Sequence, residues 1–100
     1  MSTANRTTDV RVIDNPDQSR YEGWSGDALV GLADYYSAGE GIVSIPHTEV
    51  DAAYQGQGIA GVIVQFALDD LRDRGIRVIP ACPYVRHWIE QHPEYADLLA

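Results

Sequence analysis

Hydrophobic and polar residues follow two different periods along the chain. In the first half, four segments with the alternation or the β-branched and aromatic content of strands are separated by short stretches rich in Gly, Pro, Asn and Asp. From Ile59 onward apolar residues recur at helical spacing, and Gly75 supplies the expected stop of a helix over 59–74. An apolar run at 76–82 then indicates a fifth strand, and Pro83 suits the first turn of a second helix. The pattern predicts the order β-β-β-β-α-β-α, with the first four strands at 8–14, 19–24, 28–36 and 42–50.

This order predicts an α/β protein with a mixed sheet. A strand, a crossover helix and a further strand usually lie parallel in one sheet with a right-handed connection. The carboxyl ends of the fourth and fifth strands then meet at the same edge, which is where open α/β sheets bind their ligands.

Two prolines interrupt these same two strands. Pro46 lies inside the fourth strand and Pro80 inside the fifth, and neither can donate a hydrogen bond to a ladder. A bulge, or a separation of the two strands, accounts for both and leaves a slot with unpaired backbone groups. The alternative is that either proline simply ends its strand.

A glycine-rich loop leads into the first helix at residues 54–61. The first N–H groups of a helix have no internal partners and carry the positive end of the dipole, so they are available to a phosphate. Gly56 and Gly58 let the backbone approach such a ligand closely. We therefore interpret the loop as an anion-binding site, with an ordinary glycine-containing turn as the alternative.

The string Gly56-x-Gly58-x-x-Gly61 also matches the dinucleotide fingerprint, but its surroundings do not. A dinucleotide-binding unit requires an acidic residue about 20 positions further on, and the sequence there is Arg77-Val78-Ile79-Pro80. No Lys follows the loop, which also excludes a P-loop.

Composition and charge narrow the classes of partner. The 100 residues are 45% hydrophobic and 22% charged, which predicts one globular domain over 8–100 preceded by a flexible segment at 1–7. The apolar runs are too short for a membrane span, and we expect a cytoplasmic protein because no signal-peptide core follows the first residues. A net charge of −8 argues against nucleic acid or an anionic membrane as partner and is compatible with a cationic substrate.

Gln55-Gly56-Gln57-Gly58-Ile59-Ala60 fits Q/R-x-x-G-x-G/A, the acetyl-CoA pyrophosphate motif of the GNAT N-acetyltransferases. Taken with the blocks at 45–50, 78–85 and 92–95, it makes the chain resemble the small single-domain GNAT-like proteins of the YjdJ type. The resemblance extends over residues 8–97, nearly the whole chain.

The resemblance implies a truncated GNAT fold in which the paired helices after the first strand are missing. It implies acetyl-CoA as cosubstrate, with the thioester between the separated fourth and fifth strands. The backbone around Glu49 and Val50 is then expected to pair with the pantetheine arm. The loop that holds the pyrophosphate comprises Gln55, Gly56, Gln57, Gly58, Ile59, Ala60 and Gly61.

Two catalytic candidates follow from the chemistry of acetyl transfer. His47, on the strand face that alternation shares with Ile45 and Glu49, is a candidate general base, or else a hydrogen-bonded structural histidine. Tyr84 is a candidate proton donor to the departing thiolate, as a tyrosine often is in the GNAT superfamily. Its alternative is to pack against Trp88 one helical turn later.

Cys82 is the third catalytic candidate. It ends the predicted fifth strand at the start of a helix, with Arg86 four residues on, and this setting favours a nucleophilic thiolate. The alternative is a small buried apolar residue. The spacing of Cys82 to His87 and His92 resembles no zinc site, and we expect no metal.

The sequence thus predicts an acetyl-CoA-dependent N-acetyltransferase acting on a primary amine, as a monomer or weak homodimer. A cationic acceptor is a secondary hypothesis from the acidic charge. The competing function is a CoA-binding regulatory or sensor module without efficient catalysis, because the helical pair is lost and no base is unambiguous.

Overall fold

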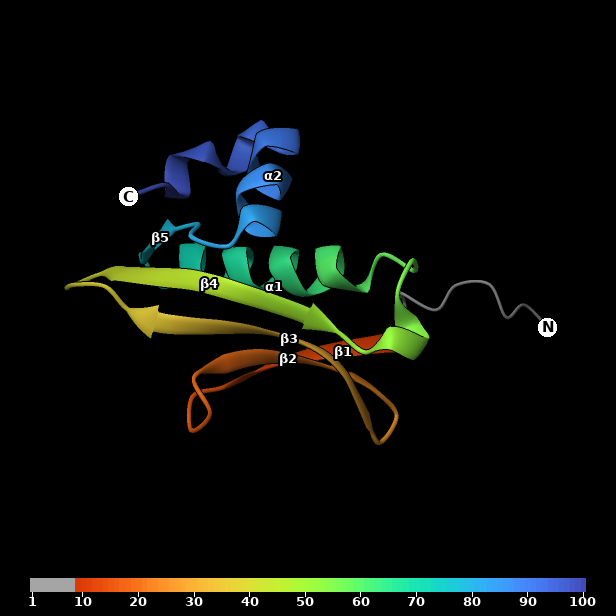
Figure 1. The fold of residues 1–100 in the computed structure, drawn as a ribbon. Coiled ribbons are helices and arrows are strands. Elements are labelled where there is room, and N and C mark those ends of the chain that lie inside the picture. The colour runs from red at the N-terminus through yellow and green to blue at the C-terminus, as the bar shows by residue number, and fades with distance from the viewer. Residues whose placement is uncertain (1–8) are drawn as a thin grey trace.

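The computed structural model describes residues 9–100, and the predicted flexible segment at 1–7 lies outside them. One five-stranded sheet in the order β1-β2-β3-β4-β5 is combined with two α-helices and short 3-10 helices (Figure 1). The elements are β1 (Val10–Asn15), β2 (Arg20–Ser25), β3 (Ala28–Ser37), β4 (Ile42–Val50), η2 (Ala52–Tyr54), α1 (Ile59–Asp73), β5 (Arg77–Ile79), α2 (Pro83–Gln91) and η3 (Pro93–Leu98). This order confirms the predicted α/β architecture, although the sequence did not indicate the 3-10 helices.

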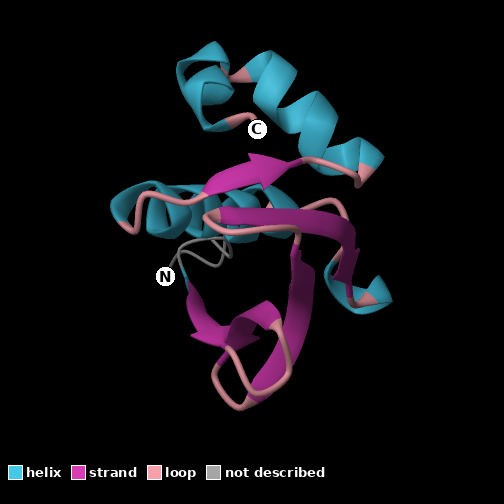
Figure 2. Cartoon of the chain, turned by 90° about the vertical axis from the view of Figure 1, so that its left-hand side faces the viewer, coloured by secondary structure: helices cyan, strands magenta, loops and turns pink. Residues whose placement is uncertain are grey.

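The first four strands form an antiparallel meander, and β5 pairs with β4 in the parallel direction across the α1 crossover. The meander curls away below α1, so that one face of the sheet carries the helix (Figure 2). No helix within residues 9–100 is long and apolar enough to cross a membrane.

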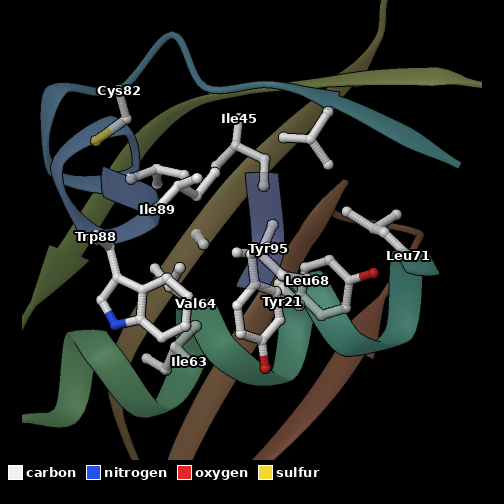
Figure 3. Packing of buried hydrophobic residues seen from close by; sticks show 14 of the residues in the cluster. Tyr21, Ile45, Ile63, Val64, Leu68, Leu71, Cys82, Trp88, Ile89 and Tyr95 are labelled. Atoms are coloured by element: carbon white, nitrogen blue, oxygen red, sulfur yellow. The ribbon is translucent and has the colours of Figure 1, made fainter. Parts of the chain in front are cut away.

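Helix α1 packs directly against two glycines of the sheet, Gly23 on β2 and Gly31 on β3. A Cβ on Gly23 or on Gly31 would come within 2.9 or 2.8 Å of Ile63 Cδ1. Ile63 therefore occupies space that side chains on β2 and β3 would otherwise fill. Six residues of α1 are buried in the resulting core: Ile59, Ile63, Val64, Ala67, Leu68 and Leu71 (Figure 3).

The α2 and η3 segment packs alongside α1 rather than over the open sheet face (Figure 1). Tyr95 Oη donates to Asp69 Oδ1 at 2.8 Å, and Arg72 Nη2 donates to the Glu94 carbonyl at 3.0 Å. At the other end of α1, a Cβ on Gly61 would lie 3.4 Å from both Trp88 Nε1 and Tyr84 Oη. These contacts hold the start of α2 next to the glycine loop.

Strand β5 is shorter than predicted. It ends at Ile79 because Pro80 has no N–H to donate and Ala81 N turns back to the Ile79 carbonyl at 2.9 Å. The placement of Cys82 at the end of the strand is therefore wrong. Cys82 is instead the N-cap residue of α2, and its N–H donates to the Ile45 carbonyl at 2.9 Å.

Strand β4 contains a bulge at Pro46. Asp34 pairs with His47 and Tyr36 pairs with Ser44, so three steps along β4 oppose two steps along β3. The extra residue confirms the bulge and reverses the alternation of side chains. Ile45 is consequently 1% exposed in the core (Figure 3), whereas His47 points to solvent, and the prediction that they share a face is wrong.

Candidate functional site

The N-terminal end of α1 has no capping side chain. Gly58, with a φ of 79°, is the N-cap residue and makes no side-chain cap, and the first α1 bond runs from Val62 N to the Gly58 carbonyl at 3.2 Å. The first turn contains no acidic residue. The N–H groups at the start of the helix are therefore directed outward without a helical partner, as the anion-binding interpretation requires.

The loop opens onto a cavity of about 260 Å³. A Cβ on Gly56, which has a φ of 81°, would meet no described atom within 4 Å, so the loop backbone is accessible. The cavity is lined by Val50, Tyr54, Gln55, Gly56, Gly58, Ile59, Ala60 and Tyr84. The structure thus brings most of the predicted loop residues together with Tyr84, which comes from α2.

The side chains of two glutamines in the loop differ in their hydrogen bonding. Gln57 Oε1 is buried and has no hydrogen-bond partner within the described part of the chain. Gln55 Nε2 donates to the Val50 carbonyl at 3.2 Å. Gln55 thus occupies one strand carbonyl beside the gap, whereas Gln57 does not line the cavity.

Strands β4 and β5 separate after three residue pairs. Their pairing ends at Ser44 and Ile79, while β4 continues to Val50. Asp51 N donates to the Val30 carbonyl, so alternation directs the backbone groups of Glu49 toward β3. Thr48 and Val50 therefore present their backbone to the gap, and the expected pairing position shifts from Glu49 to Thr48.

Cys82 lies in this gap with its thiol against β4. Its Sγ is 3.6 Å from Thr48 Oγ1, and the residue is 6% exposed. Burial raises the pKa of the thiol, but the N–H of Val85, the Thr48 hydroxyl and the N–H groups of Tyr84 and Thr48 outweigh it, so the pKa is lowered overall. Arg86 is not among these groups.

Tyr84 is close enough to Cys82 to respond to its charge. Burial and the neighbouring Cys82 thiolate raise the pKa of the phenol. Tyr84 is 39% exposed and lines the loop cavity. Its hydroxyl is therefore protonated near neutral pH and lies beside the start of α1, 3.4 Å from a Cβ placed on Gly61, and the role of proton donor stays a prediction.

His47 is not brought to Cys82. Its Nε2 lies 3.2 Å from Glu49 Oε1, and the two side chains are 56% and 61% exposed. Thr48, which contacts the sulfur, stands between His47 and Glu49 in sequence and faces the opposite side of β4. The three catalytic candidates thus divide between the two sides of the strand.

No group of three or more His, Cys, Asp and Glu side chains in residues 9–100 is arranged to hold a metal ion. His92 Nδ1 lies 2.7 Å from the Trp88 carbonyl, and the His92 ring stacks on Trp88 at 3.8 Å. The absence of a metal remains a prediction.

The glycine loop, the separated strands and the helical order are the features of one family. The profile of the GCN5-related N-acetyl-transferase family matches residues 20–98. This chain belongs to the GCN5-related N-acetyltransferase (GNAT) family. The family resemblance and the truncated GNAT fold predicted from sequence are thereby confirmed.

Several vertebrate proteins are related to this GNAT chain. Protein NATD1 of Bos taurus is 36% identical over 67 residues, which make up 67% of this chain and 58% of the bovine protein. NATD1 of Danio rerio is 31% identical over 75 residues, which make up 66% of its length. The similarity thus spans only about three fifths of the bovine relative.

Two solved structures share the GNAT fold. A GCN5-like protein from Staphylococcus aureus superposes with a TM-score of 0.71 at 16% identity, covering 93% of this chain and 90% of its own. Rv2747 from Mycobacterium tuberculosis, crystallised in complex with CoA, gives a TM-score of 0.57 at 22% identity over 76% of this chain and 48% of its own. At these identities the likeness establishes the fold alone.

Proposed function

We propose that this GNAT protein binds acetyl-CoA at the glycine loop and transfers the acetyl group to a primary amine. The observation that carries the proposal is that several features of the structure lie close together. The uncapped start of α1, the Val50 end of β4 and the Tyr84 side chain line one cavity, and the thiol of Cys82, two residues before Tyr84, contacts β4 at Thr48.

The residues present fit CoA. The outward N–H groups of Ile59, Ala60 and Gly61 are donors of the kind that pyrophosphate oxygens accept. The backbone of Thr48 and Val50 faces the gap, where the amides of a pantetheine arm can pair with it.

Acetyl transfer requires one proton to leave the amine and one to reach the thiolate. The amine nitrogen attacks the thioester carbonyl carbon, and the carbon–sulfur bond breaks. In our proposal His47 on the open side of β4 takes the amine proton, directly or through water. Tyr84 on the helical side supplies a proton to the departing thiolate.

Cys82 offers a second route with the same overall balance. Its thiolate would attack the acetyl carbonyl and release CoA, and the amine would then take the acetyl group from Cys82. The donors around Sγ support a thiolate, whereas its 6% exposure supports direct transfer without it. Retention of the acetylation rate in Cys82→Ala would exclude the covalent route, and trapping of an acetylated Cys82 by mass spectrometry would support it.

The competing function is a CoA-binding module without efficient turnover. The distance of His47 from the Cys82 side of β4 favours it, because no base touches the thiol within the described residues. Such a module would bind CoA as well as acetyl-CoA and release no thiol in the presence of amines.

Thermal unfolding with acetyl-CoA, CoA, NAD and ATP tests the binding half of the proposal. A ligand at about 100 times its dissociation constant adds about 2.7 kcal/mol of stability. A shift with acetyl-CoA and CoA alone would support the site, and thiol release during an amine screen would then separate enzyme from binding module. The absence of any shift with acetyl-CoA would overturn the proposal.

A further inference from the structure

A second cavity, of about 520 Å³, adjoins the loop cavity at the end of β4. The two cavities share Val50 and Gln55 in their linings. The second is formed by β3 and by the segment that leads from β4 into η2. Its lining comprises Leu29, Val30, Gly31, Leu32, Glu49, Val50, Asp51, Ala52 and Gln55.

This cavity combines apolar surface with negative charge. Leu29 and Leu32 supply apolar side chains, Glu49 and Asp51 supply carboxylates, and no basic side chain lines it. The Asp51 carboxylate already accepts the Ala53 N–H at 2.9 Å, whereas Glu49 is 61% exposed at the rim. An alkyl chain that carries a positive charge complements both properties, and an anion does not.

The cavity is also connected to the proposed reaction. Leu32 lies between Gly31 and Ala33, which face α1, so Leu32 and its register partner Glu49 face the open side of the sheet. Glu49 reaches His47 on that side at 3.2 Å. A ligand that lies over Leu32 and Glu49 can therefore extend along the open side of β4 toward His47 and the bulge, where β4 separates from β5.

We propose that the cavity between β3 and the end of β4 binds the amine acceptor, and that this acceptor is an aminoalkyl compound with a second positive charge. This inference rests on the proposed acetyltransferase function. The reacting amine lies toward His47, the alkyl chain lies over Leu32, and the distal cation lies beside Glu49 and Asp51.

Two probes with the same carbon chain test the charge requirement: cadaverine, a diamine, and pentylamine, a monoamine. We expect Glu49→Gln to raise the KM for cadaverine about threefold more than the KM for pentylamine, as for an exposed ion pair. Glu40→Gln removes an equal charge from an exposed loop outside the cavity and serves as the control. An equal loss for both amines, or a kcat effect alone, would overturn the inference, because Glu49 would then act only through His47.

A second pair of variants tests the position of the cavity. Ala52→Arg places a cation in the lining, and Ala53→Arg places one on the neighbouring exposed residue outside it. We expect Ala52→Arg to raise the KM for cadaverine about tenfold and Ala53→Arg to change it little. Equal effects of the two substitutions would overturn the inference.

A direct binding measurement separates this inference from the proposed function. Cadaverine is titrated into the CoA-saturated protein while backbone amide shifts are followed by NMR. Shifts confined to 29–32 and 49–52 that Ala52→Arg removes would support the cavity even without turnover, and their absence would overturn it. Failure of the proposed function is recognised separately, by the absence of a thermal shift with acetyl-CoA.

Discussion

The two ends of α1 differ in their hydrogen bonding: the N-terminal end has free N–H groups, whereas the C-terminal end is bound to the sheet by side chains. At the N-terminal end, glycines precede the helix, no side chain caps it, and its first N–H groups face a cavity. At the C-terminal end, Asp70 Oδ2 accepts from Tyr21 Oη and from Arg74 Nη2, each at 2.7 Å. Arg74 also reaches Asp14, which accepts from Tyr35 Oη at 2.6 Å.

The comparison indicates that stability and ligand binding are separated along one helix. The C-terminal network joins α1 to β1, β2 and β3 and positions the helix without any ligand. The N-terminal end leaves its donors for a ligand, which costs the fold the stabilisation of a cap, typically about 1 kcal/mol. Substitutions at the two ends should therefore affect different measurements.

Gly58→Asp should have the largest effect, and on binding. A carboxylate at the start of α1 would occupy the free N–H groups and repel a pyrophosphate. We expect the thermal shift with acetyl-CoA, about 2.7 kcal/mol at saturating ligand, to disappear. Gly26→Asp is the matched control, because Gly26 also has a positive φ, of 57°, with no described atom within 4 Å of a Cβ. A Gly58→Asp protein that still responds to acetyl-CoA would show that the loop is not the site.

Asp70→Asn should act on stability and on its pH dependence. Burial raises the pKa of Asp70, but the hydrogen bonds from Tyr21 and Arg74 outweigh it, so the pKa is lowered below its ordinary value of 3.8. A lowered carboxyl pKa stabilises the fold above the ordinary value, and this contribution is lost as the pH falls through the folded-state pKa.

Asp70→Asn should therefore cost about 1.5 kcal/mol near pH 7 in urea unfolding, and the difference from the unsubstituted protein should vanish in acid. Asp73→Asn, at the exposed end of the same helix, is the control. A difference that is independent of pH would contradict the charge-based account. The acetyl-CoA dissociation constant should remain unchanged.

Tyr21→Phe should have a smaller effect at the same end. It removes the hydroxyl that donates to Asp70 and leaves Arg74 in place. We expect a loss of about 1 kcal/mol in the free energy of unfolding, whereas Tyr36→Phe, at a residue that is 58% exposed, should cost almost nothing. Equal effects of the two substitutions would mean that the network does not stabilise the fold.

Thr48→Val should have the smallest effect on the fold, and should act on the thiol alone. It removes one of the donors that hold the pKa of Cys82 down, so the thiolate fraction near neutral pH should fall. Because Cys82 is the only cysteine, thiolate absorbance at 240 nm reports on it directly. Thr48→Ser keeps the hydroxyl and should restore the fraction; a fraction that is unchanged in Thr48→Val would show that the backbone donors suffice.

The sequence predicted those features that depend on neighbours along the chain. The periods of the strands and of α1 are local, and β4 was bounded correctly at both ends. The glycine loop was identifiable because Gly56, Gly58 and the helix that follows them are contiguous. The bulge was also predictable, because Pro46 has no N–H to give to a ladder.

The remaining features depend on contacts between distant segments. Thr48 contacts Cys82, which lies 34 positions later in the sequence. The Thr48 side chain faces Cys82 only because the bulge reverses the alternation of β4. Tyr21 donates to Asp70, which lies 49 positions later. A local hydrophobic period cannot predict contacts between residues so far apart in the sequence. A threonine next to the bulge, on the side opposite His47, was the available signal for Thr48.

The bulge at Pro46 also determines where β4 can lose a residue without changing the faces of its side chains. Removal of Pro46 alone would return β4 to simple alternation with Ile45 still toward the core and His47 still toward solvent, because the bulge adds one residue between them. A deletion between His47 and Val50 would instead leave the bulge in place and move the side chains beyond it to the other face of the strand. The division of the chemistry between the two faces of β4 therefore tolerates the loss of a residue at the bulge, but not the loss of one residue between the bulge and Val50.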